Sequence, residues 1–192
     1  FPFHIDMCIC CLGGVLGAMT SCISNCYQQV FEALKSRNMA RLAQTACEVL
    51  GMPVVVTDVA YIVRAKYPNT PVDDEQWDAN TINRQIEPKF VKTFSEDGHF
   101  AKHYEADGAI LTDFGYYSKT PRLTQLIESN GSVMGYFAAL ATGVEVQKWH
   151  YEAVNIITEA FAILMEADAG VKLARFTASS AAASSSPCPL DA

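Results

Sequence analysis

The stretch from residue 122 to residue 141 places the tightest limit on how this chain can fold. It reads RLTQLIESNGSVMGYFAALA, with an apolar-rich run on each side of Asn130-Gly131. Asn-Gly suits the two positive φ angles of a type I′ turn, the tightest connection between antiparallel strands. The second run, residues 133–141, has no charged residue and predicts a central strand that is buried on both faces. We therefore expect a β-hairpin in the middle of a sheet.

Two other segments predict the remaining strands. Pro53 opens the β-branched run VVVT, and the side chains of residues 61–66 alternate with the period of a half-exposed strand. Residues 52–66 therefore predict a second hairpin, and residues 109–114 are a further strand candidate. Together these segments predict an α+β domain with a central antiparallel sheet of about five strands, flanked by helices.

Capping residues and apolar periodicity predict the helices. Asn38 suits the N-cap of a helix over residues 39–50, and Gly51 suits the position just after its end. Trp77 and Ile82 are expected to face inward from another helix, which begins after two acidic residues. The full set of predicted helices spans residues 28–35, 39–50, 75–84, 88–94 and 145–167.

The long helix at residues 145–167 carries two apolar stripes, each with steps of three and four residues. One stripe is expected to cover the sheet. The other needs a second partner, which is either the N-terminal helix of the same chain or a second copy of the protein. We expect a homodimer through helix 145–167, with burial on the N-terminal helix as the alternative.

The composition favours one domain with a substantial core. The chain has 192 residues, of which half are hydrophobic and 18% are charged, so it is too apolar for a disordered chain. Its net charge is −7, and the basic residues form no stripe. An acidic chain without a basic patch gains little from counterion release, so we expect no direct nucleic-acid binding.

The two ends of the chain differ from its body. Residues 1–27 form an apolar, Cys-rich extension that holds five of the seven cysteines. This uneven, odd count predicts no disulfide framework, which indicates a cytoplasmic body. The extension is interpreted as apolar packing without chemistry rather than as a membrane segment, a targeting remnant, a metal or redox site, or a lipidated segment. Residues 176–192 are Ala/Ser-rich and are expected to be a disordered tail.

Two stretches resemble a known class of sensory domain. Residues 39–66, which include LAQTACEVLGMPVVVTDVAYIVRAK, look like the start of the PAS/GAF-like domain in bacterial helix-turn-helix transcriptional regulators of the purine-catabolism-regulator type. The stretch PRLTQLIESNGSVMGYFAAL is similar to the late hairpin of such domains. The resemblance covers about residues 28–175. It implies a PAS/GAF-like fold that senses a small molecule, dimerises through terminal helices and relays a signal to a DNA-binding segment. No helix-turn-helix pattern follows Arg175-Phe176, so DNA binding is not carried over to this chain.

No catalytic motif is present in the sequence. It lacks G-x-S-x-G, a P-loop and the dinucleotide-binding G-x-G-x-x-G, so we expect neither an enzyme nor a cofactor. His99 and His103 would share one face of a helix and suit zinc or nickel. Because Gly98 interrupts that segment, we expect solvated loop residues and no metal. Cys47 is expected to have a structural role.

A ligand pocket between one sheet face and the crossing helices fits the resemblance best. Such pockets are lined by apolar and aromatic groups with a few polar ones, and two arginines are expected to hold a ligand carboxylate. The candidate ligand-binding residues are Arg64, Trp77, Phe94, Phe114, Tyr116, Arg122 and Tyr136, with Phe90, Ile110 and Tyr117 as further candidates.

We therefore expect a small-molecule-sensing regulatory domain of a bacterial transcriptional regulator or signalling protein. In this hypothesis a metabolite shifts the long helix, which passes the change to a partner. The alternatives are a ligand-free interaction or scaffold domain with a filled core, and a metal- or thiol-binding protein.

Overall fold

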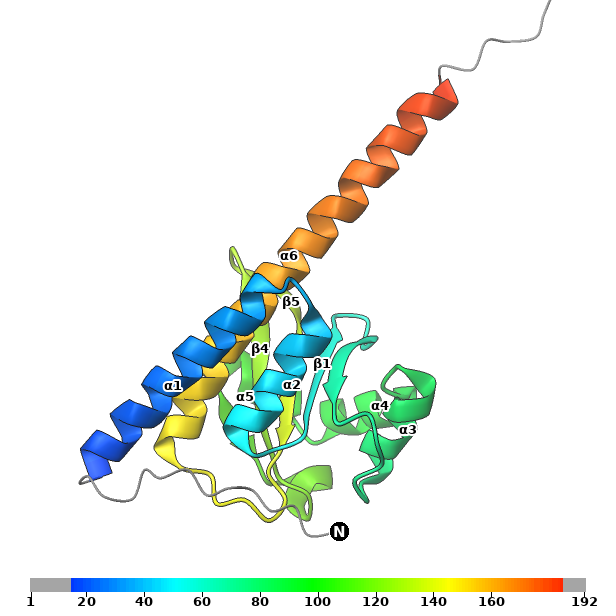
Figure 1. Cartoon of the computed structure of the whole chain (residues 1–192). Helices are drawn as coiled ribbons and strands as arrows, with labels where there is room; N and C mark the ends of the chain where they lie inside the picture. The colour runs from blue at the N-terminus through cyan, green and yellow to red at the C-terminus, as the bar shows by residue number, and fades with distance from the viewer. Residues whose placement is uncertain (1–14, 185–192) are drawn as a thin grey trace, which may run out of the picture.

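An antiparallel sheet lies between two layers of helices in the computed structural model of the chain (Figure 1). The structure describes residues 15–184, and the side chains of residues 19–170. The five strands have the order β2-β1-β5-β4-β3, which confirms the predicted α+β class and its central antiparallel sheet. The strands are β1 (Val54–Asp58), β2 (Val63–Tyr67), β3 (Ile110–Thr112), β4 (Arg122–Ser129) and β5 (Ser132–Leu140).

The hairpin of β4 and β5 has the predicted turn. Asn130 and Gly131 have φ angles of 50° and 74°, as a type I′ turn requires. Strand β5 lies between β1 and β4 and is the central strand, as the sequence predicts. Successive residues that point to opposite faces are both buried only at its end, at Ala139 and Leu140.

One face of the sheet is covered by helices α2 (Met39–Leu50) and α6 (Lys148–Ser184), and helix α1 (Val15–Lys35) packs against these two helices (Figure 1). The predicted caps of α2 are present. The Asn38 side chain accepts hydrogen bonds from the backbone N–H groups of Ala40 and Arg41 at 2.9 and 3.1 Å, and Gly51 has a φ of 66°. These caps satisfy backbone groups that the helix leaves without partners.

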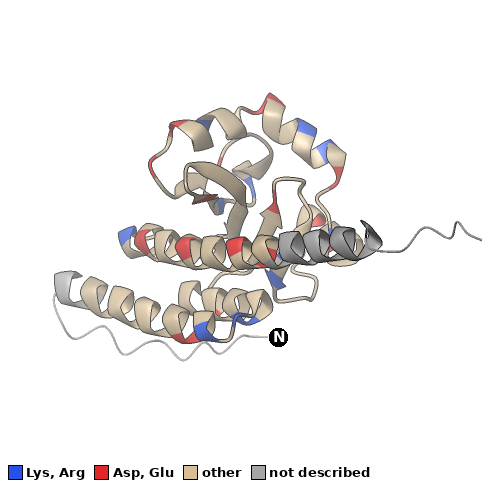
Figure 2. Ribbon diagram, turned by 90° about the horizontal axis from the view of Figure 1, so that it is seen from above, with Lys and Arg blue, Asp and Glu red and all other residues tan. Residues whose placement is uncertain are grey.

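Helix α1 lies beside α6 in both views of the molecule (Figures 1 and 2). Cys26, Val30 and Ala33 of α1 belong to the same buried cluster as residues of both apolar stripes of α6. The cluster includes Ala153, Ile156 and Ala160 of the first stripe, and Val154, Ile157, Phe161 and Leu164 of the second. The second stripe of α6 is therefore covered within the chain, which is the arrangement that the sequence offered as the alternative to a dimer.

Close packing of β1, β5 and α6 depends on one glycine. A Cβ atom built at Gly135 would lie 2.0 Å from the backbone oxygen of Thr57 and 3.1 Å from Cε of Met165. Any side chain at this position would push β1 away from β5.

The other sheet face is covered by α3 (Glu75–Asn83), α4 (Pro88–Glu96), α5 (His99–Glu105) and the 3₁₀ turn η1 (Gly115–Ser118). Trp77 is 1% exposed, as predicted. The prediction for Ile82 is wrong, because this side chain is 83% exposed. Trp77 and Ile82 are five residues apart, which places them about 140° apart around a helix of 3.6 residues per turn.

The terminal helices differ from the predicted segment boundaries. Helix α6 runs to Ser184 and thus into the segment that was expected to be a disordered tail. Alanine has the highest helix propensity, and no Gly or Pro lies between Gly170 and Pro187. Helix α1 begins at Val15, within the predicted extension. The cysteines at 8–11 and residues 185–192 lie outside the described residues. Within residues 15–184 no helix has the length and apolar character needed to span a bilayer.

Candidate ligand chamber

A cavity of about 70 Å³, here called the chamber, lies between the sheet and helices α4 and α5. Each strand of the β3–β4–β5 half of the sheet contributes to it, as do α4, α5, η1 and the turn between β1 and β2. Its lining residues are Tyr61, Ile86, Phe94, His99, Phe100, His103, Thr112, Tyr117, Thr124, Gln125, Tyr136, Phe137 and Ala138.

Aromatic rings form most of the chamber wall. The rings of Tyr61 and Tyr136 are stacked, with centroids 5.2 Å apart and an interplanar angle of 7°. The ring of Phe100 lies 6.2 Å from Tyr61 and 6.3 Å from Tyr136, and Phe94 lies 5.2 Å from Tyr117. Burial raises the pKa of Tyr136, as do interactions with the hydroxyls of neighbouring tyrosines, so its phenol stays protonated.

His99 and His103 both line the chamber, on one face of α5. The prediction that they are solvated loop residues is wrong. Gly98 has a φ of 75° and occupies the N-cap of α5, so it begins the helix instead of interrupting it. His99 is 3% exposed.

Three imidazole nitrogens of the chamber wall lack hydrogen-bond partners. Both ring nitrogens of His99 and Nδ1 of His103 are buried without a hydrogen-bond partner. Oδ2 of Asp97 lies 3.7 Å from Nε2 of His99, too far for a hydrogen bond. Burial lowers the pKa of His99. Burial, and then the nearby His99, lower the pKa of His103 to about 4, so both rings are neutral at pH 7.

Gln125 supplies a third unpartnered polar group. Its side-chain oxygen Oε1 is buried and accepts no hydrogen bond. Gln125 and His103 line both the chamber and a polar pocket of about 130 Å³ beside it, which Tyr104, Gly108 and Glu128 also line. Buried polar groups are normally paired, so this cluster of three residues marks a place where a ligand or water would gain hydrogen bonds.

An outer groove of about 560 Å³ adjoins the chamber along α4. The groove and the chamber share Tyr61, Ile86 and Phe100. These three side chains therefore separate the chamber from the groove.

Three of the predicted residues line the chamber: Phe94, Tyr136 and the further candidate Tyr117. Phe114 and Tyr116 lie next to lining residues. The ring of Phe114 stacks on His99 at 4.4 Å, and the ring of Tyr116 lies 5.4 Å from that of Tyr117.

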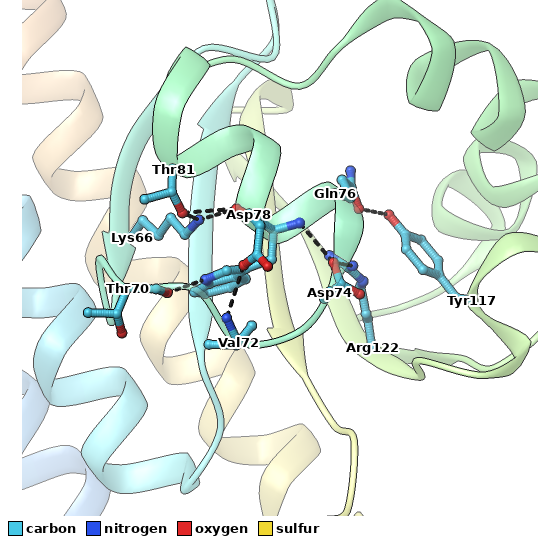
Figure 3. A network of polar contacts seen from close by, with 10 residues as sticks. Lys66, Thr70, Val72, Asp74, Gln76, Asp78, Thr81, Tyr117 and Arg122 are labelled. Carbon is cyan, nitrogen blue, oxygen red and sulfur yellow. Dashed lines mark hydrogen bonds and ion pairs between the residues drawn. The ribbon is translucent and has the colours of Figure 1, made fainter. Parts of the chain in front are cut away.

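Arg122 belongs to a polar network that fixes α3 to the sheet (Figure 3), and Trp77 takes part in it through its backbone and its indole N–H. Nη2 of Arg122 lies 2.7 Å from Oδ1 of Asp74, and Trp77 Nε1 donates to the backbone oxygen of Thr70 at 3.2 Å. Lys66 donates to the backbone oxygen of Trp77 and to the Thr81 hydroxyl. Burial lowers the pKa of Lys66 to about 8.

The two arginines that were expected to share a ligand carboxylate have separate partners within the chain. Arg64 pairs with Asp168 of α6 and lies 3.6 Å from Asp58, whereas Arg122 pairs with Asp74. Neither arginine lines the chamber.

The remaining metal and thiol candidates find no support among the described residues. No group of three or more His, Cys, Asp or Glu side chains in residues 19–170 is arranged to hold a metal ion. Burial raises the pKa of Cys26 and of Cys47 to about 11, which disfavours the reactive thiolate and agrees with a structural role for Cys47.

Comparisons with known proteins support the fold. No protein-family model matches the sequence, and no curated protein matches it either. Twenty-eight chains of solved structures match the fold. One of them is the GAF domain from an Acinetobacter phosphoenolpyruvate-protein phosphotransferase, with a TM-score of 0.54 and 7% sequence identity. The match covers 79% of this chain and 95% of that domain, so the chain has a GAF-like fold.

Proposed function

We propose that this chain is a sensory domain that binds a small molecule in the chamber. The observation that carries the proposal is the cluster of unpartnered buried polar atoms on His99, His103 and Gln125 inside an aromatic wall. An aromatic pocket with a few convergent polar groups is the usual composition of a ligand site. The GAF-like fold supports the same interpretation.

The size of the chamber defines how a ligand would enter. Pockets for drug-sized ligands hold about 300–1,000 Å³, whereas the chamber holds about 70 Å³. A molecule of a few heavy atoms fits it directly. A larger ligand needs Tyr61, Ile86 and Phe100 to move, which would join the chamber to the outer groove of about 560 Å³. We propose that these side chains form the gate.

Helix α6 is the proposed output. Arg64 of β2 pairs with Asp168, and Asn130 of the hairpin turn donates to Oε1 of Glu166 at 2.9 Å. The edge strand β2 and the turn between β4 and β5 are thus linked to the same part of α6, where it leaves the body (Figure 1). A ligand that shifts the β4–β5 hairpin would change these contacts and move α6.

Dimerisation through the terminal helices is part of the proposal. Charged residues of the described part of α1 lie only near its C-terminal end (Figure 2). Tyr27 and Phe31 of α1 are each 58% exposed, and Ile163 of α6 is 53% exposed. Apolar side chains on two adjacent helices favour a symmetric contact between two copies.

The biological setting follows from the resemblance of residues 28–175 to regulators of the purine-catabolism-regulator type. We propose a non-catalytic domain that acts in the cytoplasm as part of a bacterial transcriptional regulator or signalling protein. The segment that binds DNA would belong to another part of such a protein.

A thermal-shift screen of metabolites tests ligand binding. A ligand at 100 times its Kd stabilises the folded state by about 2.7 kcal/mol. We expect a compound that raises the Tm of the wild type and not of Ala138→Leu, which fills the chamber. The control Ala101→Leu changes an exposed alanine on α5 and should keep the response.

A second function, an interaction domain with a filled core, is favoured by the small volume of the chamber. Compounds that act equally on the wild type and on Ala138→Leu, or no active compound at all, would support it.

A further inference from the structure

The chamber contains no permanent charge to balance an ionic ligand. Among its lining residues there is no Asp, Glu, Lys or Arg. Arg122, one of the two arginines that were predicted to hold a ligand carboxylate, is 2% exposed and neutralised by Asp74. A carboxylate or an ammonium ion that entered would lose its hydration without gaining a counter-charge among the lining residues, which is costly.

The polar groups that line the chamber are uncharged, and they include both hydrogen-bond donors and hydrogen-bond acceptors. A neutral imidazole offers one N–H donor and one acceptor nitrogen, and an amide oxygen accepts. His99, His103 and Gln125 therefore leave both donors and acceptors unsatisfied. A ligand that pairs with them must carry an acceptor and a donor close together.

We infer that the chamber takes an uncharged ligand with a carbonyl acceptor and an adjacent N–H donor, of the primary carboxamide, lactam or urea class. The inference rests on the proposed function, because it specifies the ligand of the same chamber. It differs from the expectation of a carboxylate, since that expectation depended on two arginines that pair with carboxylates of the chain itself.

Isosteric probes that differ only in charge test the inference on the full chain. Acetamide, acetate and acetamidinium have nearly the same size, as do benzamide, benzoate and benzamidinium. The first set suits the closed chamber, and the second needs the gate to open. Binding is measured by amide chemical-shift titration in NMR at matched ionic strength.

We expect acetamide to bind at least about tenfold more tightly than either ion, because unpaired buried polar groups and unbalanced charges are penalised. Gln125→Leu should weaken acetamide binding by about tenfold. His150→Leu is the matched control, since His150 is buried at 4% exposure but lies outside the chamber.

A change of selectivity separates ligand recognition from a merely structural effect. Gln125→Glu places a carboxylate at the chamber and should reverse the preference from acetamide to acetamidinium. A general loss of folding would lower the affinity for all three probes together, and this is checked by the NMR spectrum of the free variant.

The outcomes distinguish the two proposals. Tighter binding of acetate or benzoate to the wild type, lost in Ala138→Leu, would overturn the inference and leave the proposed function standing. Equal binding of all three members of a set would also overturn it. No binding of any of the six probes would count against the proposed function, and the inference would fall with it.

Discussion

Asp74 and Arg122 form a buried ion pair, with Oδ1 of the first 2.7 Å from Nη2 of the second and the side chains only 4% and 2% exposed. Asp74 also caps α3 by accepting from the backbone N–H of Trp77 at 2.8 Å. The guanidinium of Arg122 lies 4.4 Å from the centre of the Tyr117 ring, which lines the chamber. The pair therefore connects α3, β4 and the chamber wall.

Replacing Arg122 with methionine is expected to destabilise the protein strongly. The substitution leaves Asp74 buried without its counter-charge, and breaking a buried pair in this way costs about 3–5 kcal/mol. Urea unfolding at neutral pH measures the loss.

The matched control is Lys92→Met, which removes an exposed pair in which Nζ lies 3.6 Å from Oε1 of Glu96. Such pairs contribute about 0–1 kcal/mol. A loss for Arg122→Met no larger than that of the control would show that the buried pair does not stabilise the fold.

This pair also marks the limit of sequence-based prediction. Its members are 48 positions apart, and no local pattern connects a helix cap with the first residue of a later strand. The caps at Asn38 and Gly51 and the Asn130-Gly131 turn were predictable, because each depends on residues within a few positions of one another. The sheet followed from such local signals.

The chamber was only partly predictable for the same reason. Phe94, Tyr117 and Tyr136 were identified from their aromatic character, whereas His99 and His103 were assigned to a loop. These histidines were assigned to a loop because Gly98 was expected to interrupt a helix. In the structure Gly98 has a positive φ and is the N-cap of α5. The pair of histidines four residues apart was the available signal. Tyr61 was not among the predicted site residues. It lies in the turn between β1 and β2, has a φ of 61°, and lines the chamber.

Gly135 provides a second stability prediction. Gly135→Ala should lower the free energy of unfolding by about 1–3 kcal/mol, because its Cβ would lie 2.0 Å from the Thr57 oxygen. Gly170→Ala is the control, since no atom lies within 4 Å of a Cβ built there and alanine favours the helix. The Tm should fall for Gly135→Ala and rise for Gly170→Ala. Equal shifts of the two Tm values would argue against close packing at Gly135.

The neutral histidines make stability depend on pH. The pKa of His103 is about 4 in the folded chain and about 6.5 when unfolded. The unfolded state binds the proton more readily, so the contribution is fully present above about pH 6.5 and is lost as the pH falls toward 4. We expect His103 to account for about 2 kcal/mol of lost stability between about pH 7.5 and about pH 5.

His103→Gln isolates that contribution. The free energy of unfolding of the wild type, measured in urea at both pH values, should fall more steeply with acid than that of the variant. Parallel pH profiles would mean that His103 is not kept neutral by burial.

The exposed apolar side chains of α1 and α6 predict the oligomeric state. We expect the wild type to sediment as a dimer and Phe31→Glu to shift the equilibrium toward monomer by at least about tenfold, because two like charges would face each other across a symmetric contact. Ile163→Glu should act in the same direction. Ile82→Glu is the control, since Ile82 is also exposed, at 83%, but lies on α3 in the opposite helical layer. Analytical ultracentrifugation over a range of concentrations gives the dissociation constants. A wild type that stays monomeric at high concentration would remove the proposed dimer, and equal weakening by Ile82→Glu would place the contact elsewhere.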